Sequence, residues 1–125
     1  MATNSRVVTS YMQRTDGRGS MLGITNVGTW KEVNYVTSRA GMVRGNHYHK
    51  ESHELVFILE GEVEVVLRDI NTAGDMETMI LRAGQGIEIN TFVLHTMHYL
   101  TDTVQISLLD RAFDPSNPDL HTMDS

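Results

Sequence analysis

The sequence predicts an all-β protein, built as a sandwich or barrel of short strands. Runs rich in valine, isoleucine, threonine and leucine are separated by turn-like glycines, with 10 glycines against 2 prolines in the chain. Closely spaced short strands with turn residues between them are typical of all-β sandwiches and barrels. No stretch carries the apolar stripe of an amphipathic helix. Since 125 residues suit one compact domain, we expect a single domain over residues 1–125.

Two strands are predicted in the first half of the chain. In residues 30–38, apolar and polar residues alternate, so Val33 and Tyr35 share one face of the strand and polar side chains the other. Residues 53–60 are nearly all apolar, which is typical of a strand covered on both faces.

Three more strands are predicted in the second half. Residues 61–70, 86–92 and 103–109 all alternate between apolar and polar side chains. Residues 71–75 contain Asn, Gly and Asp, and predict a turn between strands. The alternation is lost in the tail, 111–125, which we expect to be ordered only if it docks on the rest of the chain.

Composition excludes several functions. The net charge is -6 and no Lys/Arg cluster occurs, so we expect no nucleic-acid binding. No apolar run of about 18 residues is present to span a membrane, and the first residues lack the apolar core of a signal peptide. Cysteine is absent, which leaves neither disulfides nor a thiolate nucleophile. The simplest interpretation is a cytoplasmic protein.

The stretch "RGNHYHKESHE" (44–54) is the strongest candidate for chemistry. In a strand, His47 and His49 point to the same side and could present two imidazoles to one metal ion. Glu54 joins them only if a turn within the stretch resets the alternation. The alternative is an unbroken strand with four ligands on one face: His47, His49, Glu51 and His53. The spacing alone does not choose between the two sets.

A second histidine pair, His95 and His98, lies some forty residues further on. Three imidazoles and a carboxylate suit Zn, Fe, Mn, Ni or Co, and two histidines with one carboxylate and open positions would match the facial triad of non-haem iron enzymes. The sequence therefore predicts a divalent metal ion as cofactor, without naming the metal.

The spacing around this stretch resembles the first motif of the cupin superfamily. That motif has a glycine, five residues, HxH, three or four residues, a glutamate, six residues and a second glycine. The chain matches every fixed position and every gap with Gly41, His47, His49, Glu54 and Gly61.

The second cupin motif is matched only in part. Gly84 and His95 hold, whereas Asn90, Phe92 and Tyr99 stand where proline, glycine and asparagine are usual. The metal histidine is therefore kept, but the turn before it departs from the family pattern.

The resemblance implies a cupin-type antiparallel jelly-roll β-barrel with a core at about 22–110. It favours the turn between His49 and Glu54, and it directs His53 away from the metal. Cupins commonly pair through their sheets, so the resemblance also implies a homodimer. The metal ligands that it implies are His47, His49, Glu54 and His95.

A narrower resemblance concerns cupins that act on sugar nucleotides. The words "DGRGS" (16–20), "WKEVNYV" (30–36) and "RGNHYHK" (44–50) are similar to those of 3,4-ketoisomerases of dTDP-4-keto-6-deoxyhexoses. The cupin domains of capsular-polysaccharide epimerases are also similar, including a late "FDPSNPD"-like segment. Because ketoisomerase-type proteins usually lack a full metal set, the complete set here favours the epimerase type.

This resemblance implies epimerisation or ketoisomerisation of a 4-keto sugar, which needs a base, an acid and a stabilised enolate. With His47 and His49 held by a metal, the candidate bases are Tyr35, His53 and His98. Without a metal, His47 or His49 becomes the base and Tyr35 the acid. Arg44 is the candidate to bind a diphosphate, since its planar fork suits phosphate oxygens.

Two other functions are compatible with the same residues. The histidine and glutamate set also suits a metal-dependent oxygenase or a related small-molecule enzyme. A cupin can equally bind a small ligand or sugar without catalysing a reaction.

Overall fold

The computed structural model describes residues 5–72 and 76–123, which form eleven strands and no helix. None of the described segments is a helix long and apolar enough to cross a bilayer. The strands are β1 (Arg6–Thr9), β2 (Met12–Asp16), β3 (Gly19–Gly23), β4 (Glu32–Ser38), β5 (Val43–His47), β6 (Glu54–Glu60), β7 (Glu62–Asp69), β8 (Glu77–Arg82), β9 (Gln85–Ile89), β10 (Val93–Tyr99) and β11 (Thr103–Leu109).

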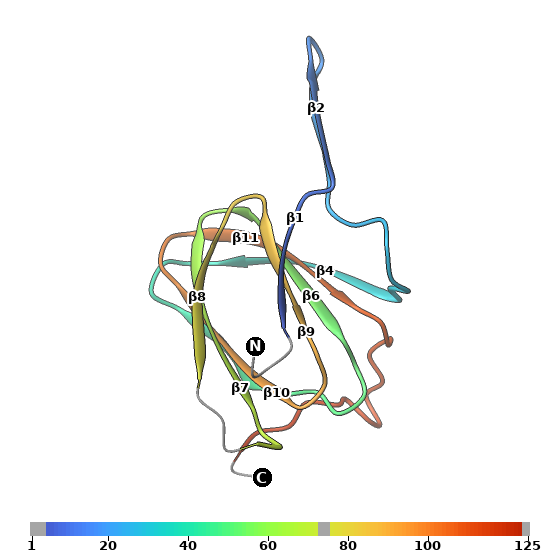
Figure 1. Cartoon of the computed structure of the whole chain (residues 1–125), viewed down its shortest axis with the longest axis vertical. Coiled ribbons are helices and arrows are strands. Elements are labelled where there is room, and N and C mark those ends of the chain that lie inside the picture. The colour runs from blue at the N-terminus through green and yellow to red at the C-terminus, as the bar shows by residue number, and fades with distance from the viewer. Residues whose placement is uncertain (1–4, 73–75, 124–125) are drawn as a thin grey trace.

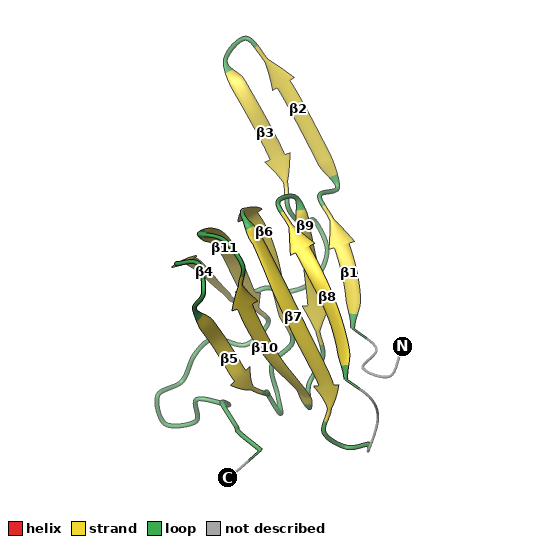
Figure 2. Ribbon diagram, turned by 90° about the vertical axis from the view of Figure 1, so that its left-hand side faces the viewer, coloured by secondary structure: helices red, strands yellow, loops and turns green. Residues whose placement is uncertain are grey.

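Two antiparallel sheets form the body of the molecule (Figures 1 and 2). The larger has the strand order β1-β9-β6-β11-β4 and the smaller the order β5-β10-β7-β8. Because strands that are neighbours in a sheet are distant in sequence, the arrangement is the jelly roll of a cupin barrel, as predicted. The core between the sheets consists of Val56, Ile58, Val63, Val65, Leu67, Leu81, Ile87, Ile89, Val93, Met97 and Tyr99.

The alternation predicted for the strands is confirmed. Every second residue of β7 is buried, from Val63 to Leu67, and β9 buries Ile87 and Ile89. In β6, four consecutive apolar residues from Leu55 to Ile58 are at most 1% exposed, as expected for a strand covered on both faces.

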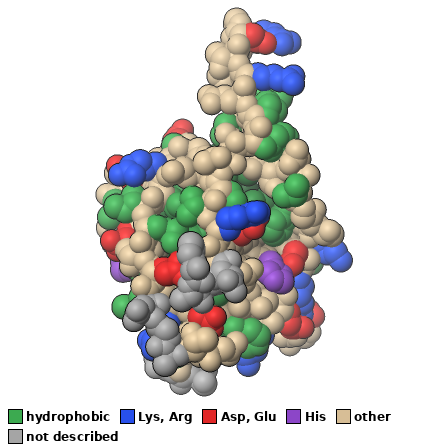
Figure 3. Space-filling view, in the orientation of Figure 1, with side chains coloured by type: hydrophobic (Ala, Val, Ile, Leu, Met, Phe, Trp, Pro, Cys, Tyr) green, Lys and Arg blue, Asp and Glu red, His purple; other side chains and the backbone are tan. Residues whose placement is uncertain are grey.

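The hairpin β2–β3 projects from the barrel as a separate two-stranded sheet (Figure 2). It turns at Gly17 and Arg18, where the Asp16 carboxylate accepts the Arg18 backbone N–H at 2.8 Å. Charged side chains gather at its far end, and hydrophobic side chains lie nearer its base (Figure 3). Strand β1 pairs with β9 upstream of this hairpin, so the barrel begins earlier than the predicted core of 22–110.

The two predicted irregular segments have different outcomes. Of the turn predicted at 71–75, residues 73–75 lie outside the described residues. The tail contains no regular strand within its described part, but it docks through an isolated antiparallel bridge between Tyr48 and His121. Residues of the tail line a cavity together with three of the predicted metal ligands, His47, His49 and Glu54.

Candidate metal centre

Four side chains converge at one end of the barrel. His47 is the last residue of β5, His49 lies in the loop that follows, Glu54 begins β6, and His95 comes from β10. One ligand atom from each lies within 4.8 Å of the others. The turn after His49 resets the alternation, so the unbroken-strand alternative is wrong. The structure brings together the set of four that the cupin resemblance implied.

A bulge in β5 determines which side chains enter the barrel. Gly45 and Asn46 have φ angles of 88° and 59°, and the pairing of β5 with β10 shifts register at this point. Arg44 and His47 are three positions apart and would face opposite ways in a regular strand. Because the bulge adds a residue, both side chains line the same inner cavity.

Backbone carbonyl groups orient two of the imidazoles. His49 Nδ1 lies 2.8 Å from the Asp119 carbonyl oxygen, and His95 Nδ1 lies 3.1 Å from that of Val93. A carbonyl can only accept, so each Nδ1 carries a proton and Nε2 is the nitrogen that would bind a metal. The two Nε2 atoms lie 3.1 Å and 3.5 Å from Glu54 Oε1, so both face the same carboxylate oxygen, and His49 Nε2 is within hydrogen-bond distance of it.

The protonation states of three of the four residues, His47, His95 and Glu54, suit metal ligation. Burial, and then the neighbouring His95 and His49, lower the pKa of His47 to about 4. Burial also lowers the pKa of His95. Burial opposes ionisation of Glu54, but the hydrogen bond from His49 and the charges of the three histidines together lower the pKa of that carboxyl. Burial acts to lower the pKa of His49 too, but the hydrogen bond and charge of Glu54 raise it overall, so His49 must release a proton when a metal binds. Neutral imidazoles and an ionised carboxylate are the forms that bind metal, so the set fits a divalent ion once His49 has lost that proton.

Two cavities meet at this cluster. The inner one, of about 250 Å³, lies within the barrel and is lined by His47, Glu54, His95, Arg44 and Tyr99, among others. The outer one, of about 200 Å³, is closed on one side by the tail and shares His47 and Glu54 with the inner cavity. A ligand in either cavity would therefore contact the cluster.

Arg44 lies at the far end of the inner cavity, where its side chain is held by β4. Its Nε donates to Ser38 Oγ at 2.8 Å, and an Nη donates to the Thr37 carbonyl at 2.9 Å. Arg44 also lines a larger surface hollow of about 580 Å³. The guanidinium therefore stands between the interior and the surface, in a position where it could meet a charged group of a ligand.

The predicted catalytic side chains do not reach the inner cavity, and the expectation that they are pocket residues is corrected. Tyr35 is 70% exposed on the outer face of β4, because Asn34 and Val36 occupy its inner face. His53 lies at the surface and pairs with Asp110 at 2.9 Å.

His98 is the third of these candidates. In β10, the buried residues are His95, Met97 and Tyr99, so alternation directs His98 to the opposite face of the sheet. His98 is not among the described residues that line either cavity.

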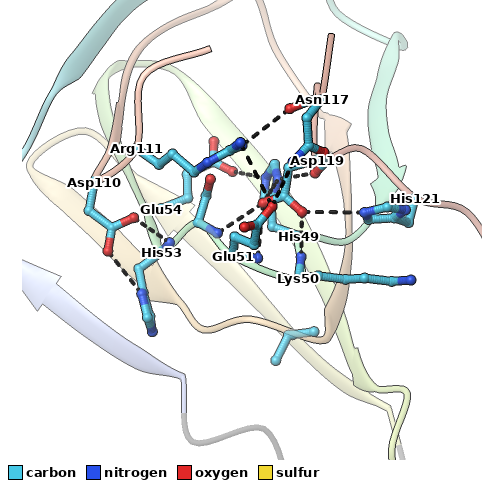
Figure 4. A network of polar contacts seen from close by, with 12 residues as sticks. His49, Lys50, Glu51, His53, Glu54, Asp110, Arg111, Asn117, Asp119 and His121 are labelled. Carbon is cyan, nitrogen blue, oxygen red and sulfur yellow. Dashed lines mark hydrogen bonds and ion pairs between the residues drawn. The ribbon is translucent and has the colours of Figure 1, made fainter. Parts of the chain in front are cut away.

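Two site residues were missed by reasoning from the sequence. Tyr99 lines the inner cavity and donates to Gln105 Oε1 at 2.6 Å. Tyr99 stands where the second cupin motif usually has asparagine. This departure from the motif is the feature of the sequence that could have identified Tyr99 as a site residue. Asp119, in the tail, is 2% exposed and accepts backbone N–H groups from the turn between His49 and Glu54 (Figure 4). No sequence pattern linked it to a turn nearly seventy residues earlier.

The fold is the cupin-type jelly roll, which solved structures of sugar-nucleotide enzymes share. More narrowly, the chain belongs to the family described as the polysaccharide biosynthesis C-terminal domain, whose model matches residues 14–121. A curated relative is the UDP-2-acetamido-2,6-beta-L-arabino-hexul-4-ose reductase of Pseudomonas aeruginosa, 27% identical over 112 residues. The match covers 86% of this chain but 30% of the reductase, so the chain spans under a third of that relative's length.

Solved structures share the fold. A 3,4-ketoisomerase from Helicobacter canadensis superposes with a TM-score of 0.79 at 20% identity, covering 94% of this chain and 90% of its own. The capsular polysaccharide assembling protein CapF from Staphylococcus aureus gives 0.70 at 23% identity, over 89% of this chain and 33% of CapF. The dTDP-4-dehydrorhamnose 3,5-epimerase from Sulfolobus tokodaii gives 0.77 at 21% identity, over 90% and 73% of the two chains.

Proposed function

We propose that this chain is a metal-binding cupin that transfers a proton beside the carbonyl group of a 4-keto sugar nucleotide, as an epimerase or a ketoisomerase. The observation that carries the proposal is the convergence of three imidazoles and one carboxylate, of which His47, Glu54 and His95 line a cavity that also holds Arg44. The similar proteins support the substrate class, since their names include a ketoisomerase, a dTDP-sugar epimerase and a UDP-hexulose reductase.

The chemistry requires removal of the C3 proton, which the neighbouring C4 carbonyl makes acidic, and its return to the same or another carbon. The enolate oxygen formed between these steps must be stabilised. His47, His49, Glu54 and His95 would hold the metal ion, which supplies Lewis acidity for that oxygen when bound.

Arg44 and Tyr99 are the cavity residues left to bind and protonate the substrate. Arg44 offers a planar fork to the diphosphate, and its hydrogen bonds to β4 fix the position of that fork. Burial raises the pKa of Tyr99, so its hydroxyl stays protonated at neutral pH and can donate a proton. With the metal held, the residues described as lining the inner cavity offer no base besides the ligands, so the C3 proton passes to solvent water. If no metal is held, His47 accepts that proton, because it is the only one of the three clustered imidazoles that is half-buried and not fully buried.

The proposal is tested by metal analysis and isotope exchange on the purified chain. We expect about one divalent ion per chain, which His49→Ala loses because a ligand is removed. The metal-loaded protein should take up deuterium from D₂O at C3 of a 4-keto sugar nucleotide, read by NMR. Absence of uptake across a panel of dTDP- and UDP-linked 4-keto sugars would overturn the catalytic proposal. Ligand-induced thermal stabilisation without product would instead indicate a sugar-binding cupin.

The donor set also favours a second candidate, an iron-dependent oxygenase, since mixed histidine and carboxylate ligation suits non-haem iron. An oxygen electrode separates the two functions. Oxygen consumption by the Fe(II)-loaded protein with a candidate substrate would support the oxygenase, whereas traces unchanged by iron exclude it.

A further inference from the structure

The tail of the chain is attached to the turn that separates His49 from Glu54. The Asp119 carboxylate accepts backbone N–H groups from three consecutive residues, Lys50, Glu51 and Ser52, at 2.8, 3.0 and 2.9 Å (Figure 4). Its side chain is almost fully buried. A buried carboxylate that receives three N–H donors holds their backbone in one conformation, so Asp119 fixes the turn that brings Glu54 to the cluster.

The same residue also orients His49 directly. The Asp119 carbonyl oxygen lies 2.8 Å from His49 Nδ1, on the far side of the ring from Glu54. A hydrogen bond of this kind fixes the tautomer and ring orientation of a metal-binding histidine and raises its basicity. Asp119 therefore acts on His49 through its main chain and on the adjoining turn through its side chain.

The position of Asp119 is fixed from both directions along the tail. Its φ angle of 57° is unusual for a residue other than glycine, and aspartate tolerates it better than most residues. Two residues later, Tyr48 and His121 exchange backbone hydrogen bonds of 2.9 and 3.1 Å. Further upstream, the Phe113 N–H donates to Glu32 Oε1 at 2.9 Å. The tail is thus held at several points beside the cluster.

We propose that Asp119 is a positioning residue of the metal centre, which sets the orientation of His49 and of the 50–52 turn and thereby the affinity and coordination geometry of the metal. The proposal rests on the metal-binding part of the proposed function. It assigns a role in metal binding to a residue that is not one of the four ligands and does not contact the substrate. A residue that only stabilised the fold would leave the properties of the bound metal unchanged.

The test uses the full chain loaded with Co(II), whose visible absorption reports coordination geometry. Asp119→Ala should weaken Co(II) binding roughly 10- to 100-fold, measured by competition with a chromophoric chelator, and should change the absorption spectrum. Asp119→Asn keeps the side-chain shape and one acceptor oxygen, so it should restore part of the affinity. Asp114→Ala is the matched control, because that carboxylate lies in the same tail but, among the described residues, accepts hydrogen bonds from Ser116 and none from the 50–52 turn.

Each result decides the matter. If Asp119→Ala lowers the thermal stability of the metal-free protein but keeps the wild-type Co(II) affinity and spectrum, Asp119 only stabilises the 50–52 turn, and the proposal is overturned. If Asp119→Ala does not fold, the comparison of Asp119→Asn with wild type decides in the same way. If the wild-type chain itself binds no Co(II), the metal-binding half of the proposed function fails, whatever the variants do.

Discussion

At the residue scale, Gly45 determines how β5 presents its side chains. Its φ angle of 88° lies in the left-handed region, and a Cβ atom added to it would meet the His95 backbone oxygen at 2.7 Å. Gly45 therefore permits both the bulge and the close approach of β5 to β10. The placement of Arg44 and His47 in one cavity depends on this residue.

We predict that Gly45→Ala destabilises the protein more than Gly41→Ala. Both glycines have similar φ angles, 88° and 85°, but a Cβ at Gly41 meets no atom within 4 Å. Gly41→Ala should cost about 1 kcal/mol, the penalty of the left-handed conformation, whereas Gly45→Ala should cost about 2–4 kcal/mol because a backbone atom must also move. Urea unfolding of the two variants measures the difference, and equal losses would contradict the close approach.

The cupin resemblance implied the four residues that the structure brings together, whereas nothing in the sequence indicated the bulge or Asp119. The spacing by itself left two ligand sets open, and the family motif favoured the one with a turn between His49 and Glu54. The bulge depends on a register shift against β10, and the contact of Asp119 with the 50–52 turn joins segments about seventy residues apart. Such contacts depend on tertiary packing, which cannot be predicted from short patterns in a single sequence.

At the element scale, strand alternation identifies which residues share a face but not which face is inside. In β4, Val33 and Tyr35 do share a face, as predicted, but that face points outward. In β11, the more polar row, with Gln105 and Ser107, lines the inner cavity, and the apolar row points outward. An interior lined by polar residues suits a ligand cavity. Because alternation does not say which row of a strand faces inward, the sequence predicts Tyr35 as a pocket residue, whereas Tyr99 is the tyrosine that lines the cavity.

This inversion of the inner and outer faces predicts unequal effects of two tyrosine variants on stability. Tyr99→Phe removes a buried hydroxyl that donates to Gln105 at 2.6 Å, so it should lower the free energy of unfolding by about 1–3 kcal/mol. Tyr35→Phe removes a hydroxyl from an exposed ring and should change it by less than about 0.5 kcal/mol. Urea denaturation of the metal-free proteins compares them. A larger effect at Tyr35 would mean that the assigned faces of β4 and β10 are wrong.

At the scale of the whole molecule, the outer face of the larger sheet remains apolar and uncovered in the single chain. Val33 and Tyr35 are 64% and 70% exposed, and a groove of about 360 Å³ runs between this face and the base of the β2–β3 hairpin. An isolated two-stranded hairpin is only marginally stable in water, yet β2–β3 projects from the barrel with charged side chains at its end (Figure 3). These features favour a second copy of the chain as the partner that covers this face, in a homodimer.

A charge placed on this face should therefore separate the subunits. In the wild-type protein we expect sedimentation equilibrium to give a mass of twice 14.1 kDa. Val33→Lys should shift the mass toward the monomer, because a symmetric dimer buries the new charge twice without a partner for it. Ile80→Lys is the control, since Ile80 is an exposed apolar residue of the smaller sheet, 42% exposed, and should leave the mass unchanged. A wild-type monomer, or a Val33→Lys protein that still has the full dimer mass, would exclude this face as the interface. If both lysine variants dissociate, the interface involves the smaller sheet as well, and the apolar row of β4 does not alone determine the pairing.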